Sequence, residues 1–332
     1  MTFRHPAGPL LLVTALCLLA ALPAHADWAL AFGQGKGQVG FLNGSLVKPF
    51  EEASPLGPLA FRVLGDQAWV LDSLGGRLLA FDGAGRLTAT VVVHGLASNT
   101  LLEDFALVPG PDGKPESVWL GDAADGLLRR VKVADGRLLA QAGGLGDQPG
   151  RFGQIRQIEA GPGGAVFVGD VGRGVVAVFD GDGRFHRELP WQRSGFALDP
   201  AGNLGMIDFA EAVGYLWRTY DPQGRLLRTI HLGWGDHQNP RVWGLTSEGG
   251  PLVSFVPPGG YRGWLRLVAF SDYGRSLEAV QFQPPPSMNR FVDRCGQPVP
   301  GKVGPFWLAR ADFEAAPAGR FAIVRMAGEK SK

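Results

Sequence analysis

The sequence predicts an all-β fold, a six-bladed β-propeller with four-stranded blades. The chain repeats itself about every 47 residues. Each repeat divides into four short apolar segments, which Gly, Pro and Asp residues separate. No run of helical period with capping residues occurs after the first 26 residues. Four strands per unit at this period are typical of propeller blades.

A glycine turn marks the repeats. An aromatic or β-branched run followed by Gly-Arg occurs five times, and glycine suits a hairpin turn that needs a positive φ angle. The five turns are FDGAGRL (81–87), VADGRL (133–138), FDGDGRF (179–185), YDPQGRL (220–226) and FSDYGRSL (270–277). Aspartates recur nearly in phase with these glycines, each at the end of a predicted second strand. They are Asp72, Asp122, Asp170 and Asp208.

The strands of the best-defined units follow from local composition, because short β-branched segments bounded by turn residues are typical of strands. In the first unit we expect strands at 60–64, 68–72, 77–82 and 87–93. In the third unit we expect them at 156–160, 165–170, 175–180 and 185–189.

The two ends of the propeller predict how the ring closes. After the fifth blade, three further strands are expected at 290–293, 306–310 and 321–326. The missing fourth strand is supplied by an isolated apolar segment, Trp28–Phe32. Pairing of this N-terminal strand with the C-terminal blade completes a sixth blade and removes the exposed sheet edges of an open ring. Residues 27–332 therefore form one domain.

Residues 1–26 have the pattern of a secretory signal peptide. Arg4 precedes an apolar run from Leu10 to Leu22, and Ala24-His25-Ala26 predicts cleavage after Ala26. The alternative, in which these residues are retained as an N-terminal membrane anchor, is less favoured because the apolar run is short for a membrane span. We therefore expect a periplasmic or extracellular protein with no membrane span in the mature chain. Only Cys295 remains after cleavage, which excludes an intramolecular disulfide.

The charge balance bears on the class of partner. The chain has 32 Lys and Arg against 31 Asp and Glu, and loss of Arg4 makes the mature chain neutral. Because nucleic-acid binders need a basic surplus, we expect no nucleic-acid partner.

Residues 144–185 resemble the NHL repeat. They carry a Gly-x-Phe lead-in (150–152), a Phe-Val-Gly-Asp strand end (167–170) and a Val-Phe-Asp-Gly-Asp-Gly turn (178–183). The other units match more loosely, so the resemblance extends over the mature chain mainly through its strand pattern. NHL propellers include interaction platforms, RNA-binding modules and peptidylglycine amidating lyases, so the resemblance implies a fold and leaves the activity open.

Two motifs do not predict a cofactor or a metal. Residues 35–40 fit Gly-x-Gly-x-x-Gly, but a loop rather than a helix follows, so no dinucleotide is expected. The mature histidines are His94, His186, His231 and His237. No two of them have metal-ligand spacing, and we predict neither a metal site nor catalytic residues.

The candidate site lies on the face that carries the loops between blades. Arginines precede or begin the innermost strands of four blades, at Arg156, Arg193, Arg241 and Arg290. They form either an anion site or clamps that pair with Asp170 and Asp208, and the clamp interpretation is slightly favoured. For the aspartates, capping of loop backbone is favoured over cation binding. Trp191, Trp234 and His237 lie in neighbouring connectors as further contacts.

Two functions follow from these features. The leading one is a monomeric, exported, non-catalytic binding or scaffold propeller that uses its loop-rich face for a protein or a small anionic ligand. The alternative is a propeller hydrolase or lyase with a divalent metal at the channel mouth. The absence of a recognisable catalytic set favours the binding protein.

Overall fold

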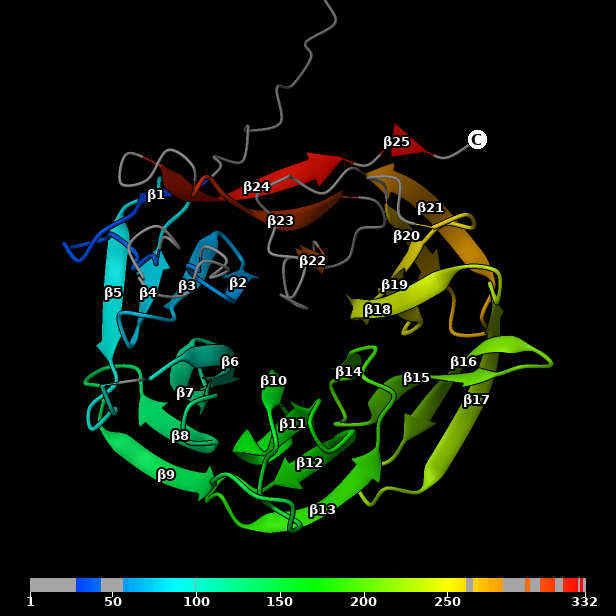
Figure 1. The fold of residues 1–332 in the computed structure, drawn as a ribbon, viewed down its shortest axis with the longest axis horizontal. Coiled ribbons are helices and arrows are strands. Elements are labelled where there is room, and N and C mark those ends of the chain that lie inside the picture. Colours follow the sequence, from blue (N-terminus) through cyan, green and yellow to red (C-terminus); the bar gives the residue numbers. More distant parts are fainter. Residues whose placement is uncertain are drawn as a thin grey trace, which may run out of the picture.

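The computed structural model describes residues 28–42, 56–98, 100–260, 265–282, 296–298, 305–313, 319–327 and 329–330. These residues form six antiparallel sheets arranged as a ring (Figure 1). Within the same residues, the helical content is one 3₁₀ turn at Pro162–Gly164, and no helix is long and apolar enough to cross a membrane. The prediction of an all-β, six-bladed propeller is confirmed.

Blades one to three follow the chain from the inside of the ring to its rim. Blade one consists of β2 (Phe61–Leu64), β3 (Gln67–Asp72), β4 (Arg77–Phe81) and β5 (Leu87–Val92). Blade two consists of β6 (Leu102–Pro109), β7 (Pro115–Asp122), β8 (Leu127–Lys132) and β9 (Leu138–Gly143). Blade three consists of β10 (Ile155–Ala160), β11 (Val166–Asp170), β12 (Val175–Phe179) and β13 (Phe185–Pro190). The strand predictions for units one and three agree with these bounds to within one residue.

Blades four and five continue in the same order. Blade four consists of β14 (Phe196–Leu198), β15 (Leu204–Ala210), β16 (Gly214–Tyr220) and β17 (Leu226–Gly233). Blade five consists of β18 (Gln238–Leu245), β19 (Pro251–Val256), β20 (Leu265–Phe270) and β21 (Ser276–Phe282). A fifth strand, β25 (Glu329–Lys330), pairs with the outer edge of β21.

The sixth blade joins the two ends of the chain, as predicted. Its sheet has the order β1-β24-β23-β22, with β1 (Trp28–Ala31), β24 (Arg320–Ala327), β23 (Pro305–Ala311) and β22 (Gly296–Pro298). The N-terminal strand is anchored through Trp28, whose ring lies 5.1 Å from that of Trp307 and whose indole N–H donates to the carbonyl of Asp82 in blade one. The innermost strand expected at 290–293 lies outside the described residues.

The turn glycines serve the purpose that the sequence predicts. Gly85, Gly136, Gly183, Gly224 and Gly274 all have φ between 69° and 84°. At two of them a side chain would also clash with the preceding blade: a Cβ would lie 2.3 Å from the carbonyl oxygen of Val92 at Gly136, and 2.4 Å from that of His231 at Gly274. These hairpins therefore need glycine both for their backbone conformation and for contact between blades.

The core lies between the blades. Each of six apolar clusters joins residues of two neighbouring blades. Between blades one and two, for example, Trp69 and Leu71 pack with Phe105 and Val118. A blade therefore buries its apolar faces against its neighbours, and its stability depends on their presence.

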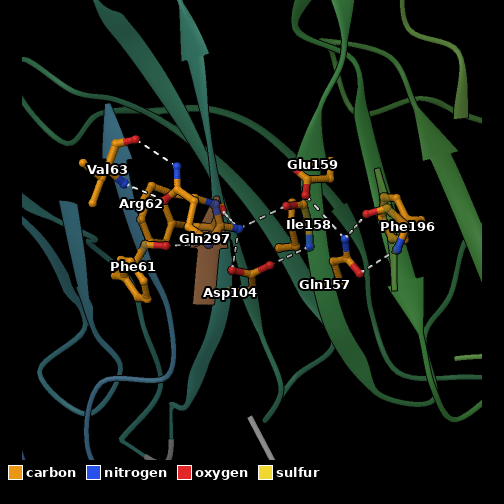
Figure 2. Close-up of polar contacts among 10 residues, drawn as sticks. Phe61, Arg62, Val63, Asp104, Gln157, Ile158, Glu159, Phe196 and Gln297 are labelled. Carbon is orange, nitrogen blue, oxygen red and sulfur yellow. Dashed lines mark hydrogen bonds and ion pairs between the residues drawn. The ribbon is translucent and has the colours of Figure 1, made fainter. Parts of the chain in front are cut away.

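Long polar side chains join the innermost strands, whose inner edges lack a neighbouring strand. Figure 2 shows that the carboxamide of Gln297 accepts from the N–H of Val63 (2.7 Å) and donates to the carbonyl of the same residue (2.9 Å). Gln157 makes the same pair of bonds to Phe196, at 3.2 and 2.7 Å. Each glutamine thus satisfies one donor and one acceptor of the next blade, as a strand partner would.

An ion pair joins the innermost strands of blades one, two and three (Figure 2). Arg62 donates to the carboxylate of Asp104 and to the carbonyl of Phe105, both at 2.8 Å. The second oxygen of Asp104 accepts from the N–H of Ile158 at 2.7 Å. Asp104 is buried, so loss of Arg62 would remove the cationic partner of a carboxylate in the interior.

Deletion of residues 28–33 tests ring closure. This change removes the outer strand of blade six with three buried side chains, Trp28, Leu30 and Phe32. Each such side chain is worth roughly 1.5–3 kcal/mol. We expect a large fall in melting temperature and aggregation through the newly exposed edge, relative to a chain that begins at Asp27. An unchanged melting temperature would contradict closure by β1.

The substitution Gln157→Leu tests the carboxamide links. It leaves the N–H and carbonyl of Phe196 without their partner, which costs about 1–3 kcal/mol for each buried group. We expect melting several degrees below that of the wild-type protein. Gln141→Leu, a change at an exposed position of β9, is the matched control. Equal melting temperatures for the two variants would show that the link contributes nothing.

Candidate functional site

A cleft of about 570 Å³ opens between blades four and five. It is lined by the β13–β14 loop, by the ends of β15 and β16 that face this loop, and by the β17–β18 connection with the start of β18. We call it the blade-four/five cleft. The lining residues are Gln192, Arg193, Ser194, Phe209, Tyr215, Gly235, His237, Gln238, Asn239, Pro240 and Arg241.

The lining is positively charged. It contains Arg193 and Arg241 and no Asp or Glu. Nε of Arg193 donates to the carbonyl of Val171 at 2.6 Å, and a guanidinium nitrogen of Arg241 donates to the carbonyl of Arg193. The guanidinium of Arg193 thus lies beside the β11–β12 turn of blade three, and a carbonyl orients a guanidinium without neutralising it, so Arg193 keeps its positive charge.

Backbone strain is concentrated at the same place. Among the described residues, three other than glycine have a positive φ: Arg193 (62°), Trp234 (59°) and Asn239 (48°). Arg193 and Asn239 line the cleft, and the ring of Trp234 lies 4.4 Å from that of His237, which also lines it. The left-handed conformation costs residues such as Arg193 and Trp234 roughly 1–2 kcal/mol, whereas asparagine adopts it more readily, and such strain occurs at functional sites.

His237 is held firmly in the wall of the cleft. Its side chain is 7% exposed, and Nδ1 lies 3.0 Å from a carboxylate oxygen of Asp236. This hydrogen bond from His237 lowers the pKa of Asp236. Tyr215 donates its hydroxyl to the carbonyl of His237 at 3.0 Å, and burial raises the pKa of Tyr215, which keeps this donor protonated. Nε2 of His237 is buried without a hydrogen-bond partner.

Asp208 lies beside the cleft. It accepts hydrogen bonds from the side chain of Gln192 and from the N–H of Phe209, and it pairs with Arg218 at 2.5 Å. Its strand runs to Ala210, two residues beyond the end that the sequence indicated. Asp208 therefore positions the lining residue Gln192 and does not itself line the cleft.

The other candidate carboxylate, Asp170, lies at the blade-three end of the same face. It accepts the N–H groups of Gln154 (2.8 Å), Gly153 (2.9 Å) and Gly172 (2.9 Å). Asp72 and Asp122 accept loop N–H groups in the corresponding positions of blades one and two. This is the capping geometry that the sequence favours for these aspartates.

The remaining candidates are dispersed. Arg156 pairs with Glu103 of blade two at 2.9 Å. Trp191 is buried between blades three and four, 6.0 Å from Phe196, so it is a core residue and not an exposed contact. Trp234 stacks on Phe255 at 5.8 Å. Arg290 lies outside the described residues. The expected ring of four arginines is therefore represented at the cleft by Arg193 and Arg241.

Of the lining residues, the sequence analysis singled out Arg193, Arg241 and His237 and gave no signal for the others, among them Phe209, Tyr215 and Asn239. Phe209 and Tyr215 belong to the apolar pattern of strands, which is also the pattern of core residues. Within the described residues, no group of three or more His, Cys, Asp or Glu is placed to hold a metal ion.

Comparisons with known proteins give the fold alone. No protein-family model and no curated protein match the chain. Among solved structures, it is similar to Kuenenia stuttgartiensis hydrazine synthase (14% identity, 77% of each chain, TM-score 0.47). It is also similar to Staphylococcus aureus virginiamycin B lyase (11% identity, 80% of this chain and 94% of that chain, TM-score 0.47). A third is regucalcin, a calcium-binding protein from Agrobacterium tumefaciens (14% identity, 81% of this chain and 90% of that chain, TM-score 0.49).

Proposed function

We propose that this chain is an exported, non-catalytic binding propeller whose blade-four/five cleft takes a small organic anion. The observation that carries the proposal is the lining of the cleft, in which two arginines are present and no carboxylate. Guanidinium groups are the preferred protein partners of carboxylates and phosphates.

Both arginines also donate hydrogen bonds to backbone carbonyls, and these bonds support the binding role. Arg241 holds the carbonyl of Arg193, and Arg193 holds that of Val171. Both guanidinium groups are therefore oriented before a ligand arrives. Groups that are already ordered lose little entropy on binding, which favours affinity.

The three left-handed residues give a second, independent reason. Arg193 lies in the β13–β14 loop and Asn239 at the register shift near the start of β18, and both adopt a conformation that glycine adopts at no cost. Since both residues line the cleft, we attribute the strain to their function there.

Small anions fit this cleft better than a protein surface does. The cleft has a volume of about 570 Å³, within the range of small-molecule sites, which enclose most of their ligand. A protein interface is typically enriched in exposed aromatic residues, but Trp191, the aromatic contact that the sequence suggested, is buried in the core.

The double variant Arg193→Ala/Arg241→Ala tests the proposal. The probe is tricarballylate, a flexible tricarboxylate without other polar groups, measured by titration calorimetry at low ionic strength. We expect the wild-type protein to bind it and the variant to bind about 30-fold more weakly, equivalent to about 2 kcal/mol. Melting of the variant is measured alongside, because Arg193 and Arg241 also bond to the carbonyls of Val171 and Arg193.

The control is Arg137→Ala/Arg184→Ala, which removes two exposed arginines from hairpin turns far from the cleft and changes net charge equally. It should retain wild-type affinity. If both double variants lose affinity equally, the anion is attracted by overall charge and not by this cleft. If the cleft variant loses stability while no tricarballylate binds to the wild-type protein, the arginines are clamps alone.

A further inference from the structure

His237 has a hydrogen-bonding atom that the fold does not use. Its N–H donates to the carbonyl of Trp234 at 2.9 Å, its own carbonyl accepts from Tyr215, and Nδ1 bonds to Asp236. Nε2 alone has no partner in the described residues. A buried polar group without a partner costs about 1–3 kcal/mol, and such a group in a native structure calls for an explanation.

The partner of Nδ1 determines what Nε2 can do. Asp236 is a carboxylate, which only accepts hydrogen bonds when ionised, so Nδ1 of His237 carries the proton. In the neutral imidazole, the other nitrogen then has a free lone pair and is an acceptor. A ligand group that reaches Nε2 must therefore donate a hydrogen.

The surroundings limit the size of that group. The imidazole lies between aromatic rings, 4.4 Å from Trp234 and 5.8 Å from Phe255, measured between ring centroids. Its Nε2 has almost no contact with solvent. Because Nε2 is closed to groups the size of water, a ligand group reaches it only when the neighbouring rings shift. A hydroxyl group requires the smallest shift, and a hydrated cation or a bulky amide a much larger one.

From this geometry we infer that the blade-four/five cleft selects hydroxy acids, with His237 Nε2 accepting the hydrogen bond of the ligand hydroxyl while Arg193 and Arg241 bind its carboxylate. This inference rests on the proposed function, because it assigns the anionic end of the ligand to the two arginines. The inference adds the hydroxyl group that His237 recognises, and with it the chemical class of the ligand. Selectivity arises because an acid without the hydroxyl leaves Nε2 unpaired.

The test compares two acids that differ by one hydroxyl, citrate and tricarballylate, by titration calorimetry at pH 8. We expect the wild-type protein to bind citrate about tenfold more tightly. The variant His237→Phe keeps an aromatic ring against Trp234 but lacks the acceptor, and its ratio of affinities should fall to about one. His231→Phe, at an exposed position of β17, should keep the wild-type ratio.

A second variant tests the same inference without altering a buried side chain, in case His237→Phe fails to fold. Asp236→Asn changes a mostly exposed side chain and removes the carboxylate that fixes the tautomer, so the preference for citrate should decrease without loss of stability. Nitrogen chemical shifts of the imidazole should show a protonated Nδ1 in the wild-type protein and a mixture of tautomers in Asp236→Asn.

The outcomes separate this inference from the proposed function. If tricarballylate binds through the arginines but citrate binds no better, the hydroxy-acid inference is wrong and the anion site remains. If His237→Phe retains the citrate preference, another residue recognises the hydroxyl and the inference is again wrong. If neither acid binds, both proposals fail.

Discussion

Burial of each blade against its neighbours is the constraint on which the structure depends. The six apolar clusters lie between blades, so a blade alone would expose both faces of its sheet. The ring must therefore close, and closure requires strands from both ends of the chain. The contacts of Trp28 with Trp307 and with the carbonyl of Asp82 show how firmly the N-terminal strand is integrated.

The same constraint determines where a ligand can bind. Because apolar residues occupy the space between sheets, polar groups gather at the innermost strands and at the loops. At the centre, Gln157, Gln297 and the Arg62–Asp104 pair are used to join one blade to the next. Between blades four and five the join is different: the N–H of Val242 donates to the carbonyl of Ser194 at 2.7 Å, beside the cleft. Arg193 and Arg241, the residues that precede the two ends of this bond, both line the cleft.

Much of the fold could be predicted from the sequence, because strand positions depend on local alternation and on turn glycines such as Gly183 and Gly224. Closure could be predicted from the isolated strand Trp28–Phe32. The site was predicted less well. Arg156 and Arg193 occupy similar positions next to the innermost strands of their blades, but Arg156 forms an ion pair with Glu103, whereas Arg193 lines the cleft. That difference depends on loop conformation, and the left-handed backbone of Arg193 and Asn239 leaves no trace in the composition.

A crystal structure of the protein soaked with an iodinated dicarboxylate, 5-iodoisophthalate, tests the central claim most directly. The anomalous signal of iodine locates the bound molecule independently of any assumption about its pose. The account predicts a peak in the blade-four/five cleft, with carboxylate oxygens within hydrogen-bonding distance of Arg193 and Arg241. A peak elsewhere on the propeller, with density for the cleft unchanged, would contradict it.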